Sequence, residues 1–494
     1  MKKIITIFAL ASLVFVGCTK LEEEIYDKLP GDGYPENASQ VATLTVDSYK
    51  RLQNLVDDNG WWFLAQELSS DGFCAPTRAS DWFDGGKWLV MHQHNWSNDV
   101  EGINRMWGTF WEGIIASNGI LDKLRKLEQN DNTRGKIAEV EVMRSFYYYL
   151  LMDNYGSTPY IVTADLPGDF LPLKVPRTEI YDSLIATIER SLPYLRPIDN
   201  KLLATRYMAF ALLSKLYINS EVYTGTPQWA KAEMYIDSVL AGPFRLESDV
   251  SATFKTNNDR SSEIIFSIPY DEDNFQGFRI HMRTLHYQHN LTYDMPVGPW
   301  NGFAAVPTFF DTYEDTDLRK QNWFIYGPQY TSSGAEIIES ITGEPLVIDP
   351  YLPALFMEDG AFTPKQIRTT GARAGKYEIK MGAKENLSNN FPLFRLTDFY
   401  LMKAETVIRQ GGNGDEWINP IRERADVAPW SGATIDQLLA ERGRELWLEG
   451  HRRQDLIRYG KWENAWWEKP ATDGSKRTFP IPKWAIDANP NLGI

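Results

Sequence analysis

Cysteine is nearly absent from this chain of 494 residues, which contains only Cys18 and Cys74. Two cysteines allow at most one disulfide, and the position of Cys18 gives it a different use, described below, so we expect Cys74 to stay unpaired. Without a disulfide the fold must be held together by packing of its interior, which a chain of this length can supply.

Long hydrophobic runs and an excess of positive charge are also missing. After residue 16 no apolar stretch is long enough to predict a transmembrane helix. The 51 Lys and Arg residues are outnumbered by 66 Asp and Glu residues, which gives a formal charge of −15. This balance disfavours nucleic acids and anionic lipid surfaces as partners, and it says little about neutral sugars.

Sequence motifs for cofactor or metal chemistry are missing as well. The chain has no glycine-rich phosphate loop and no His-Glu-x-x-His zinc motif. It has six histidines and no cysteine cluster, whereas a metal site needs three or four ligands with supporting partners. We therefore predict no metal centre and no cofactor, and we leave open a structural Ca²⁺ held by loop oxygens.

The N-terminus has the pattern of an exported lipoprotein. Lys2 and Lys3 precede an apolar run over residues 4–16, and Gly17 stands directly before Cys18. A basic start, a short apolar core and a small residue before the cut are typical of a signal peptide. We predict that this signal ends at Gly17 and that Cys18 receives lipid as the new N-terminus. The alternative is an ordinary signal whose cut falls near a cysteine.

The predicted organisation is a signal peptide over residues 1–17, a polar tether over 18–40 and a single domain over 41–494. Apolar residues recur at helical spacing in four segments of this domain, which are 181–192, 209–217, 229–239 and 393–407. The helix–turn–helix pattern of the second and third segments resembles a tetratricopeptide unit. Between about 245 and 390 Pro, Gly, Asn and aromatic residues crowd the chain. We therefore predict a mainly α fold, a tetratricopeptide-like helical-repeat scaffold that carries a loop-rich insert with short strands.

Aromatic residues are abundant, at 13% with 17 Trp, and many gather in two clusters without helical spacing. Trp82 and Trp88 belong to the first cluster, whereas Tyr287 and Trp300 belong to the second, inside the insert. A sugar presents a C–H face that stacks on such rings, and nearby Asn, Asp and Arg can bond its hydroxyls. The alternative is that the rings belong to the core, as we expect for Trp61, Trp62, Trp107 and Trp111.

Residues 441–460 (ERGRELWLEGHRRQDLIRYG) form a long motif of charged residues and glycine. This motif resembles the C-terminal signature of the RagB/SusD family, and residues 143–156, 392–405 and 479–482 match that family in order. Its members are glycan-capturing outer-membrane lipoproteins of Bacteroidetes. The resemblance implies a SusD-like fold and a location on the outer membrane, where the lipid on Cys18 anchors the protein facing the outside. It also implies delivery of the glycan to a TonB-dependent transporter of the SusC type.

Members of this family build an aromatic arc from the loop after the first helix and from the loop-rich insert. Carried over by position, the resemblance implies seven candidate glycan-binding residues, which are Arg78, Trp82, Trp88, Tyr287, Trp300, Asn301 and Phe303. It also implies that the protein is not an enzyme and that it captures an oligosaccharide or polysaccharide. Nucleic acid is not an expected partner.

Two other functions stay open. A glycoside hydrolase needs two carboxylates in a cleft, and Asp81 and Asp84 are the attractive pair for it. A helical-repeat adaptor that binds only protein would have a long concave helix face and no aromatic platform. Glu441 and Glu445 resemble an acid–base pair, but the many arginines nearby predict an ion-pair network that keeps both carboxylates ionised.

Overall fold

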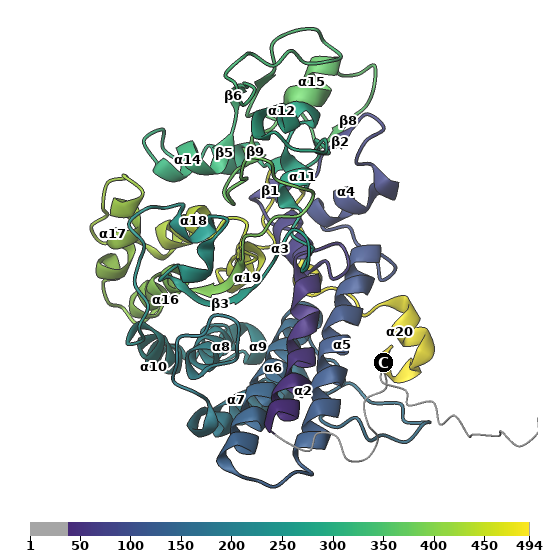
Figure 1. Ribbon diagram of the computed structural model, residues 1–494, viewed down its shortest axis with the longest axis vertical. Helices are drawn as coiled ribbons and strands as arrows, with labels where there is room; N and C mark the ends of the chain where they lie inside the picture. The colour runs from purple at the N-terminus through teal and green to yellow at the C-terminus, as the bar shows by residue number, and fades with distance from the viewer. Residues whose placement is uncertain (1–37, 494) are drawn as a thin grey trace, which may run out of the picture.

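The computed structural model describes residues 38–493; the predicted signal peptide, Cys18 and nearly all of the predicted tether lie outside this range. The chain is mainly helical, as the sequence predicts (Figure 1). Strands are short, and among the described residues each sheet has only two of them. No helix within the described range is long and apolar enough to cross a bilayer.

The first part of the chain folds into long helices that pack side by side. Helix α6 begins where the side chain of Asn130 accepts a hydrogen bond from the Thr133 N–H, and it ends at Gly156, whose φ is 75°. It packs between α5 and α7 and buries nearly all of its second half. The helices of this part are α2 (Ala38–Lys50), α3 (Trp62–Leu68), α4 (Lys87–His92), α5 (Glu101–Leu124), α6 (Asp131–Tyr155), α7 (Arg177–Ser191), α8 (Arg206–Ile218), α9 (Ser220–Thr224) and α10 (Trp229–Leu240).

The last part of the chain returns to pack on these helices. Helix α16 lies against α10 and α17, so segments far apart in sequence share one helical layer. The first three predicted stripes fall on α7, α8 and α10, which confirms those predictions. The fourth falls on α16 from Leu396 onwards, whereas its first residue, Leu393, lies on the strand that precedes this helix. The helices of this part are α16 (Leu396–Arg409), α17 (Asp415–Arg424), α18 (Ile435–Glu445), α19 (Arg452–Arg458) and α20 (Lys483–Ala488).

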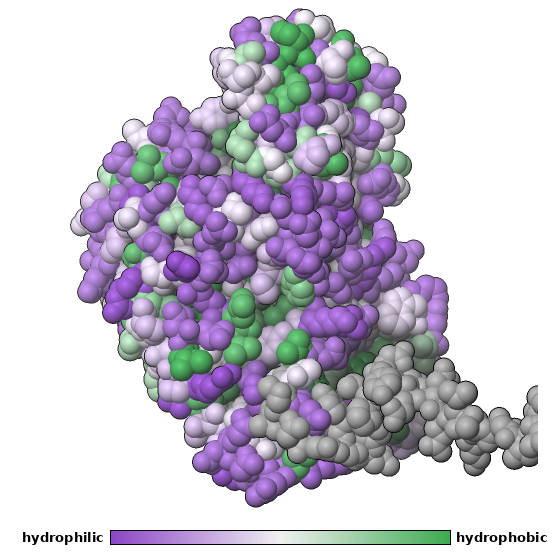
Figure 2. Space-filling model, in the orientation of Figure 1, coloured by the Kyte–Doolittle hydropathy of each residue, from purple (hydrophilic) through white to green (hydrophobic). Residues whose placement is uncertain are grey.

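Most of the predicted loop-rich insert lies in the upper part of the molecule in Figure 1, whereas its first strand, β3 (Ile264–Ile268), lies lower, near α16. The insert holds short helices and most of the short strands. Some apolar side chains of the insert are exposed, among them Ile338 and Ile341. Figure 2 shows a group of hydrophobic residues at the top of the molecule, on a face that is otherwise largely hydrophilic. The elements of the insert are β3, α11 (Ile280–Thr284), α12 (Asn290–Tyr293), β4 (Ala304–Ala305), α13 (Pro307–Phe310), α14 (Leu318–Trp323), β5 (Phe324–Ile325), β6 (Gly327–Pro328), β7 (Val347–Ile348), β8 (Phe356–Met357), α15 (Pro364–Thr369) and β9 (Arg373–Ala374).

Three strand pairings tie the insert to the rest of the chain. β3 pairs antiparallel with β10 (Phe391–Arg395), which leads directly into α16. β1 (Phe73–Cys74) pairs antiparallel with β4, and β2 (Thr77–Arg78) pairs in parallel with β8. Because β1 and β2 follow α3, these pairings hold the loop after that helix against the insert. The two aromatic clusters of the sequence therefore meet.

The signature motif forms α18 and α19 with a buried break between them. Leu448 and Gly450 in this break have φ values of 62° and 78°, and a Cβ on Gly450 would lie 2.7 Å from the Trp62 ring. Glu441 and Glu445 are fully buried and both pair with Arg319, at 2.7 and 3.0 Å. The predicted ion-pair network is confirmed.

Candidate functional site

Trp82 is the residue through which the first aromatic cluster meets the second. Its ring lies over Gly302, where an added Cβ would come within 2.2 Å of the indole, so the close approach requires glycine. The ring also packs edge-to-face on Phe303, with centroids 5.1 Å apart. The indole N–H donates to the carbonyl oxygen of Trp300 at 2.8 Å. These contacts fix the ring in a half-buried position.

The loop that carries Trp82 has a strained backbone. Ala79, Trp82 and Asp84 adopt φ values of 58°, 62° and 43°, in the left-handed region that side chains other than glycine seldom enter. Specific bonds maintain this conformation, since the Trp88 indole N–H donates to the Asp84 carboxylate at 2.7 Å. A strained backbone persists only where contacts with the surrounding structure hold it in place, and such residues are often found at functional sites.

Tyr287 is the second half-buried ring of the cluster. Its hydroxyl donates to the carboxylate of Asp81, the residue next to Trp82. The guanidinium of Arg368 lies 4.7 Å from the centre of the ring. Burial, followed by the hydrogen bond to Asp81, raises the pKa of Tyr287 to about 12. The phenol is therefore protonated throughout the physiological range and remains a hydrogen-bond donor.

Trp300 is the third half-buried ring. The guanidinium groups of Arg279 and Arg283 lie 5.8 and 5.6 Å from its centre. Both arginines are held in turn by the carboxylate of Asp58. Among the described residues no acceptor takes the indole N–H of Trp300, so this group is free to bond a ligand.

The other four candidate residues lie beneath this surface. Arg78 and Trp88 are each 2% exposed, and Asn301 and Phe303 are 0% exposed. A ring or guanidinium at this depth offers no face to a sugar, so these side chains support the site from below. Of the seven candidates, the structure leaves three partly at the surface, which are Trp82, Tyr287 and Trp300.

The buried residues have clear structural contacts. Arg78 donates to three backbone carbonyls, those of Gly302, Ile367 and Thr370, and so ties β2 to the insert. Trp88 stacks on Trp61 with centroids 4.9 Å apart and an interplanar angle of 6°. The expectation that Trp61, Trp62 and Trp107 belong to the core is confirmed, and Trp111 packs partly buried against it.

Buried Asn301 has a similar structural role. It has a φ of 52°, and its amide donates to the carbonyl of Arg368 at 3.1 Å.

The carboxylates of this region bond to the aromatic side chains. Asp81 accepts from Tyr287 and Asp84 accepts from Trp88, although both residues are themselves exposed. One carboxyl elsewhere has a raised pKa, that of Glu67, which burial brings to about 7. Glu67 is 1% exposed and accepts a hydrogen bond from the Gly450 N–H, so it lies in the core and away from any cleft.

A polar hollow lies next to Trp300. Its volume is about 660 Å³, and Arg279, whose guanidinium faces the Trp300 ring, is part of its wall. The other lining residues are mostly amides and charged groups, which are Gln53, Asn54, Asp57, Asn59, Glu272, Asp273, Gln276, Lys384, Glu385 and Asn386, with Gly277, Pro296 and Val297. Hydroxyl groups need such donors and acceptors.

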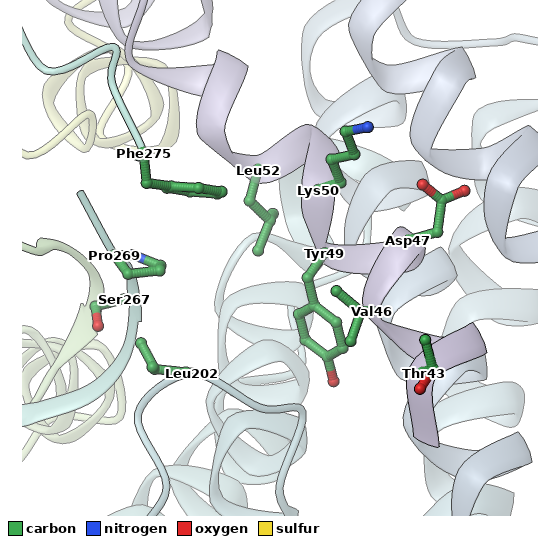
Figure 3. A pocket seen from close by; sticks show the side chains of 10 residues that line it. All are labelled: Thr43, Val46, Asp47, Tyr49, Lys50, Leu52, Leu202, Ser267, Pro269 and Phe275. Carbon is green, nitrogen blue, oxygen red and sulfur yellow. The ribbon is translucent and has the colours of Figure 1, made fainter. Parts of the chain in front are cut away.

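A second hollow, of about 570 Å³, has a different character (Figure 3). Helix α2 forms one wall of it through Val46 and Tyr49, and Leu202, Pro269 and Phe275 face them across the gap. This surface is almost entirely apolar, so it has few groups that could bond the hydroxyls of a sugar. Within residues 38–493 no group of three or more His, Cys, Asp or Glu residues is placed to hold a metal ion.

Sequence reasoning missed the residues that hold these rings. Arg279, Arg283 and Arg368 flank the rings, and Gly302 makes room for Trp82. The only available signal was their position between the predicted aromatic residues. The amides of the polar hollow come from three segments that are more than 100 residues apart, so their proximity could not be read from the sequence.

Two protein-family models match this chain. Residues 262–493 match a model described as the SusD family, and residues 56–218 match one described as starch-binding associating with outer membrane. The starch-binding protein SusD of Bacteroides thetaiotaomicron is 25% identical over 457 residues, which cover 81% of this chain and 79% of that protein. A SusD-like protein of Bacteroides ovatus is 20% identical over 486 residues, covering 92% and 82% of the two chains.

Solved structures share the fold at low sequence identity. A SusD superfamily protein from Parabacteroides distasonis has a TM-score of 0.75 at 20% identity, covering 92% of this chain and 98% of that one. The surface glycan-binding protein A from Bacteroides thetaiotaomicron, solved in complex with laminarihexaose, has a TM-score of 0.73 at 19% identity with the same coverage. These likenesses concern the fold alone.

Proposed function

Since the chain belongs to the RagB/SusD family, we propose that it captures glycan at the cell surface and performs no chemistry on it. The observation that supports this proposal most strongly is the group formed by Trp82, Tyr287 and Trp300. Two segments about 200 residues apart supply these three half-buried rings, and each ring is fixed by a hydrogen bond or a guanidinium. We call this group the ring platform.

A platform of this kind suits a sugar ligand. The apolar C–H face of a pyranose stacks on an indole or phenol, and a ring held in place loses little entropy when the ligand binds. The free indole N–H of Trp300 and the outer oxygens of Asp81 supply a donor and acceptors beside the rings. Relatives named for starch binding and glycan binding support the same ligand class.

The absence of catalysis is also part of the proposal. A glycoside hydrolase requires one carboxylic acid with a raised pKa facing a second carboxylate across a cleft. Asp81 and Asp84 both accept hydrogen bonds from aromatic side chains, and the raised carboxyl of Glu67 lies in the core. These positions favour capture over hydrolysis.

The location and partner that we propose follow from the family. Lipid on Cys18 would hold the protein to the outer membrane, and a TonB-dependent transporter of the SusC type would receive the glycan. The match to a family model for outer-membrane association supports this location.

Cys18→Ala should move the protein from the membrane fraction to the soluble fraction, and unchanged fractionation would contradict the anchor. Recovery of the native protein from mild detergent without such a transporter would contradict the partner.

The experiment that tests the proposed function is binding to a panel of polysaccharides. The purified full mature protein is run through native gels that contain starch, laminarin, xylan, polygalacturonate or no polysaccharide. We expect at least one neutral polysaccharide to retard the protein, and chromatography of the incubated polysaccharide to show no shorter products. Released oligosaccharides would indicate a hydrolase, and a protein that no polysaccharide retards would favour the protein-binding adaptor.

A further inference from the structure

We infer that the polar hollow beside Trp300 is a second part of the glycan site, and that it accepts neutral sugar units and disfavours acidic ones. This inference rests on the proposed function and adds the chemical class of the ligand to it. It follows from three features of the hollow, which are its position, its amides and its charges.

The hollow adjoins the ring platform through Arg279. Arg279 lines the hollow, and its guanidinium lies 5.8 Å from the centre of the Trp300 ring. Pro296 and Val297 also line the hollow and precede Trp300 by only a few residues. A volume of about 660 Å³ is within the range of small-molecule binding sites, so it has room for one or more sugar units. A chain stacked on Trp300 can therefore extend into this hollow.

Amide side chains give the hollow free donors and acceptors. The side chain of Asn54 forms no hydrogen bond with any of the described residues, so both ends of its amide are available. Asn386 accepts from the Gly277 N–H at 2.9 Å and keeps its own N–H groups free. Gln276 donates to the carbonyl of Glu272 at 3.0 Å and keeps its side-chain oxygen free. A sugar hydroxyl both donates and accepts, and a set of amides matches it without adding charge.

The charged groups of the hollow are already paired, with an excess of carboxylates. Arg279 pairs with Asp57 and, at 3.3 Å, with Glu385. Lys384 pairs with Asp273 at 2.8 Å and, more distantly, with Glu272. The lining has two cations and four carboxylates, and both cations are engaged. Lys380, which is not part of the lining, pairs with Glu272 at 2.9 Å and leaves an excess of one carboxylate.

A uronic acid or a sulfated sugar would find no free cation in the hollow and would be repelled by the remaining negative charge. The formal charge of −15 on the whole chain acts in the same direction.

The first test removes the two free amides. The double variant Asn54→Ala/Asn386→Ala is compared with Asn132→Ala, an exposed amide in the first turn of α6 that forms no hydrogen bond with other described residues. Affinity for the neutral polysaccharide that the wild type binds is measured by calorimetry, together with the melting temperature. We expect the double variant to lose about tenfold in affinity, as for two ordinary hydrogen bonds, and to melt somewhat lower because the Gly277 N–H loses its acceptor. Asn54→Ala alone should weaken binding without a change in melting temperature. We expect the control to bind as the wild type does.

The second test compares ligands of different charge. We expect polygalacturonate to bind the wild type at least about tenfold more weakly than the neutral polysaccharide at low salt, where repulsion is least screened. Equal affinity for the two polymers would overturn the inference. It would also be overturned if the double variant kept full affinity while Trp300→Ala lost it, an outcome in which the proposed function stands. A wild type that binds no polysaccharide would overturn both.

Discussion

Trp82 and Trp300 are both half-buried tryptophans of one cluster, yet their surroundings differ. Trp82 packs on Gly302, Phe303 and Trp88 and donates its indole N–H to a backbone carbonyl. Trp300 is flanked by two arginines and makes no hydrogen bond through its indole N–H to the described residues. Removal of the Trp82 ring would therefore disturb the core as well as the platform, whereas removal of the Trp300 ring affects mainly the platform.

Trp300→Ala is the substitution that separates binding from stability. We expect it to weaken glycan binding about fivefold to tenfold, which corresponds to about 1 kcal/mol for one stacking ring, and to leave the melting temperature nearly unchanged. Trp484→Ala, at a 52% exposed position on α20, is the matched control and should change neither quantity. Calorimetry and thermal unfolding measure both. A Trp300→Ala protein with a lower melting temperature and normal affinity would place this ring in the core.

Individual site residues could be predicted only in part from the sequence. Residue type and cluster position selected Trp82, Tyr287 and Trp300, but they selected the buried Trp88 and Phe303 equally well. Exposure depends on what packs over a ring, and in this chain the packing comes from segments about 200 residues apart. Asn301 shows the same limit, because its left-handed backbone and its bond to Arg368 are not visible in the amino-acid sequence.

At the scale of elements, the signature motif on α18 and α19 joins the insert to the helical scaffold. Glu445 lies between Arg319 of α14, in the insert, and Arg395 of β10, at distances of 3.0 and 3.1 Å. Glu449, in the break between α18 and α19, pairs with Lys376 and Arg395. Burial acts to raise the pKa of Glu449, but the charges of Arg395 and Lys376 outweigh it and lower that pKa to about 2. The network therefore remains ionised at neutral pH.

Glu445→Gln tests the role of this network. Removal of one buried charge leaves its arginine partners uncompensated, and we expect the free energy of unfolding to fall by about 3–5 kcal/mol. Urea unfolding measures this change, and the folded fraction should bind glycan with normal affinity. Glu416→Gln, at an exposed position of α17, is the matched control and should have little effect. A Glu445→Gln protein as stable as the wild type would show that the network contributes little to stability.

The elements were more predictable than the residues of the site. Helical spacing located α7, α8, α10 and α16. In the signature motif, spacing by three accounts for the Glu441–Arg444 pair, but most partners of the buried carboxylates, such as Arg319 and Arg395, come from other elements. The pairing of β1 with β4 and of β2 with β8 could not be predicted. Each of these strands has two residues, too few for the alternation that identifies a strand, and yet these pairings bring the two aromatic clusters together.

At the scale of the whole molecule, all six histidines are buried. Burial lowers the pKa of His92, His281 and His451 to about 4 each. It lowers the pKa of His289 to about 3. Glu67 is shifted in the opposite sense, because burial raises its pKa to about 7. In acid, the six buried histidines therefore lower the stability of the fold, and the carboxyl of Glu67 raises it.

These shifts predict that the protein loses stability in acid. The unfolded chain binds protons on His near pH 6.5 and the folded chain does not, so the stability present above pH 6.5 is lost as the pH falls towards 4. Each His with a pKa near 4 contributes up to about 3 kcal/mol to this loss, and Glu67 offsets about one such contribution. We expect the melting temperature to fall steeply from pH 7 to pH 5. A melting temperature that stays constant or rises over this interval would contradict the burial of the histidines.

The most direct test of the central claim is a crystal structure of the protein with a neutral oligosaccharide, chosen as the best ligand of the polysaccharide panel. The platform predicts a sugar ring stacked on Trp300 at about 4 Å, with the chain continuing into the hollow lined by Asn54 and Asn386. An oligosaccharide bound elsewhere, for instance against the apolar hollow of α2, with Trp300 free of ligand, would contradict the proposed site.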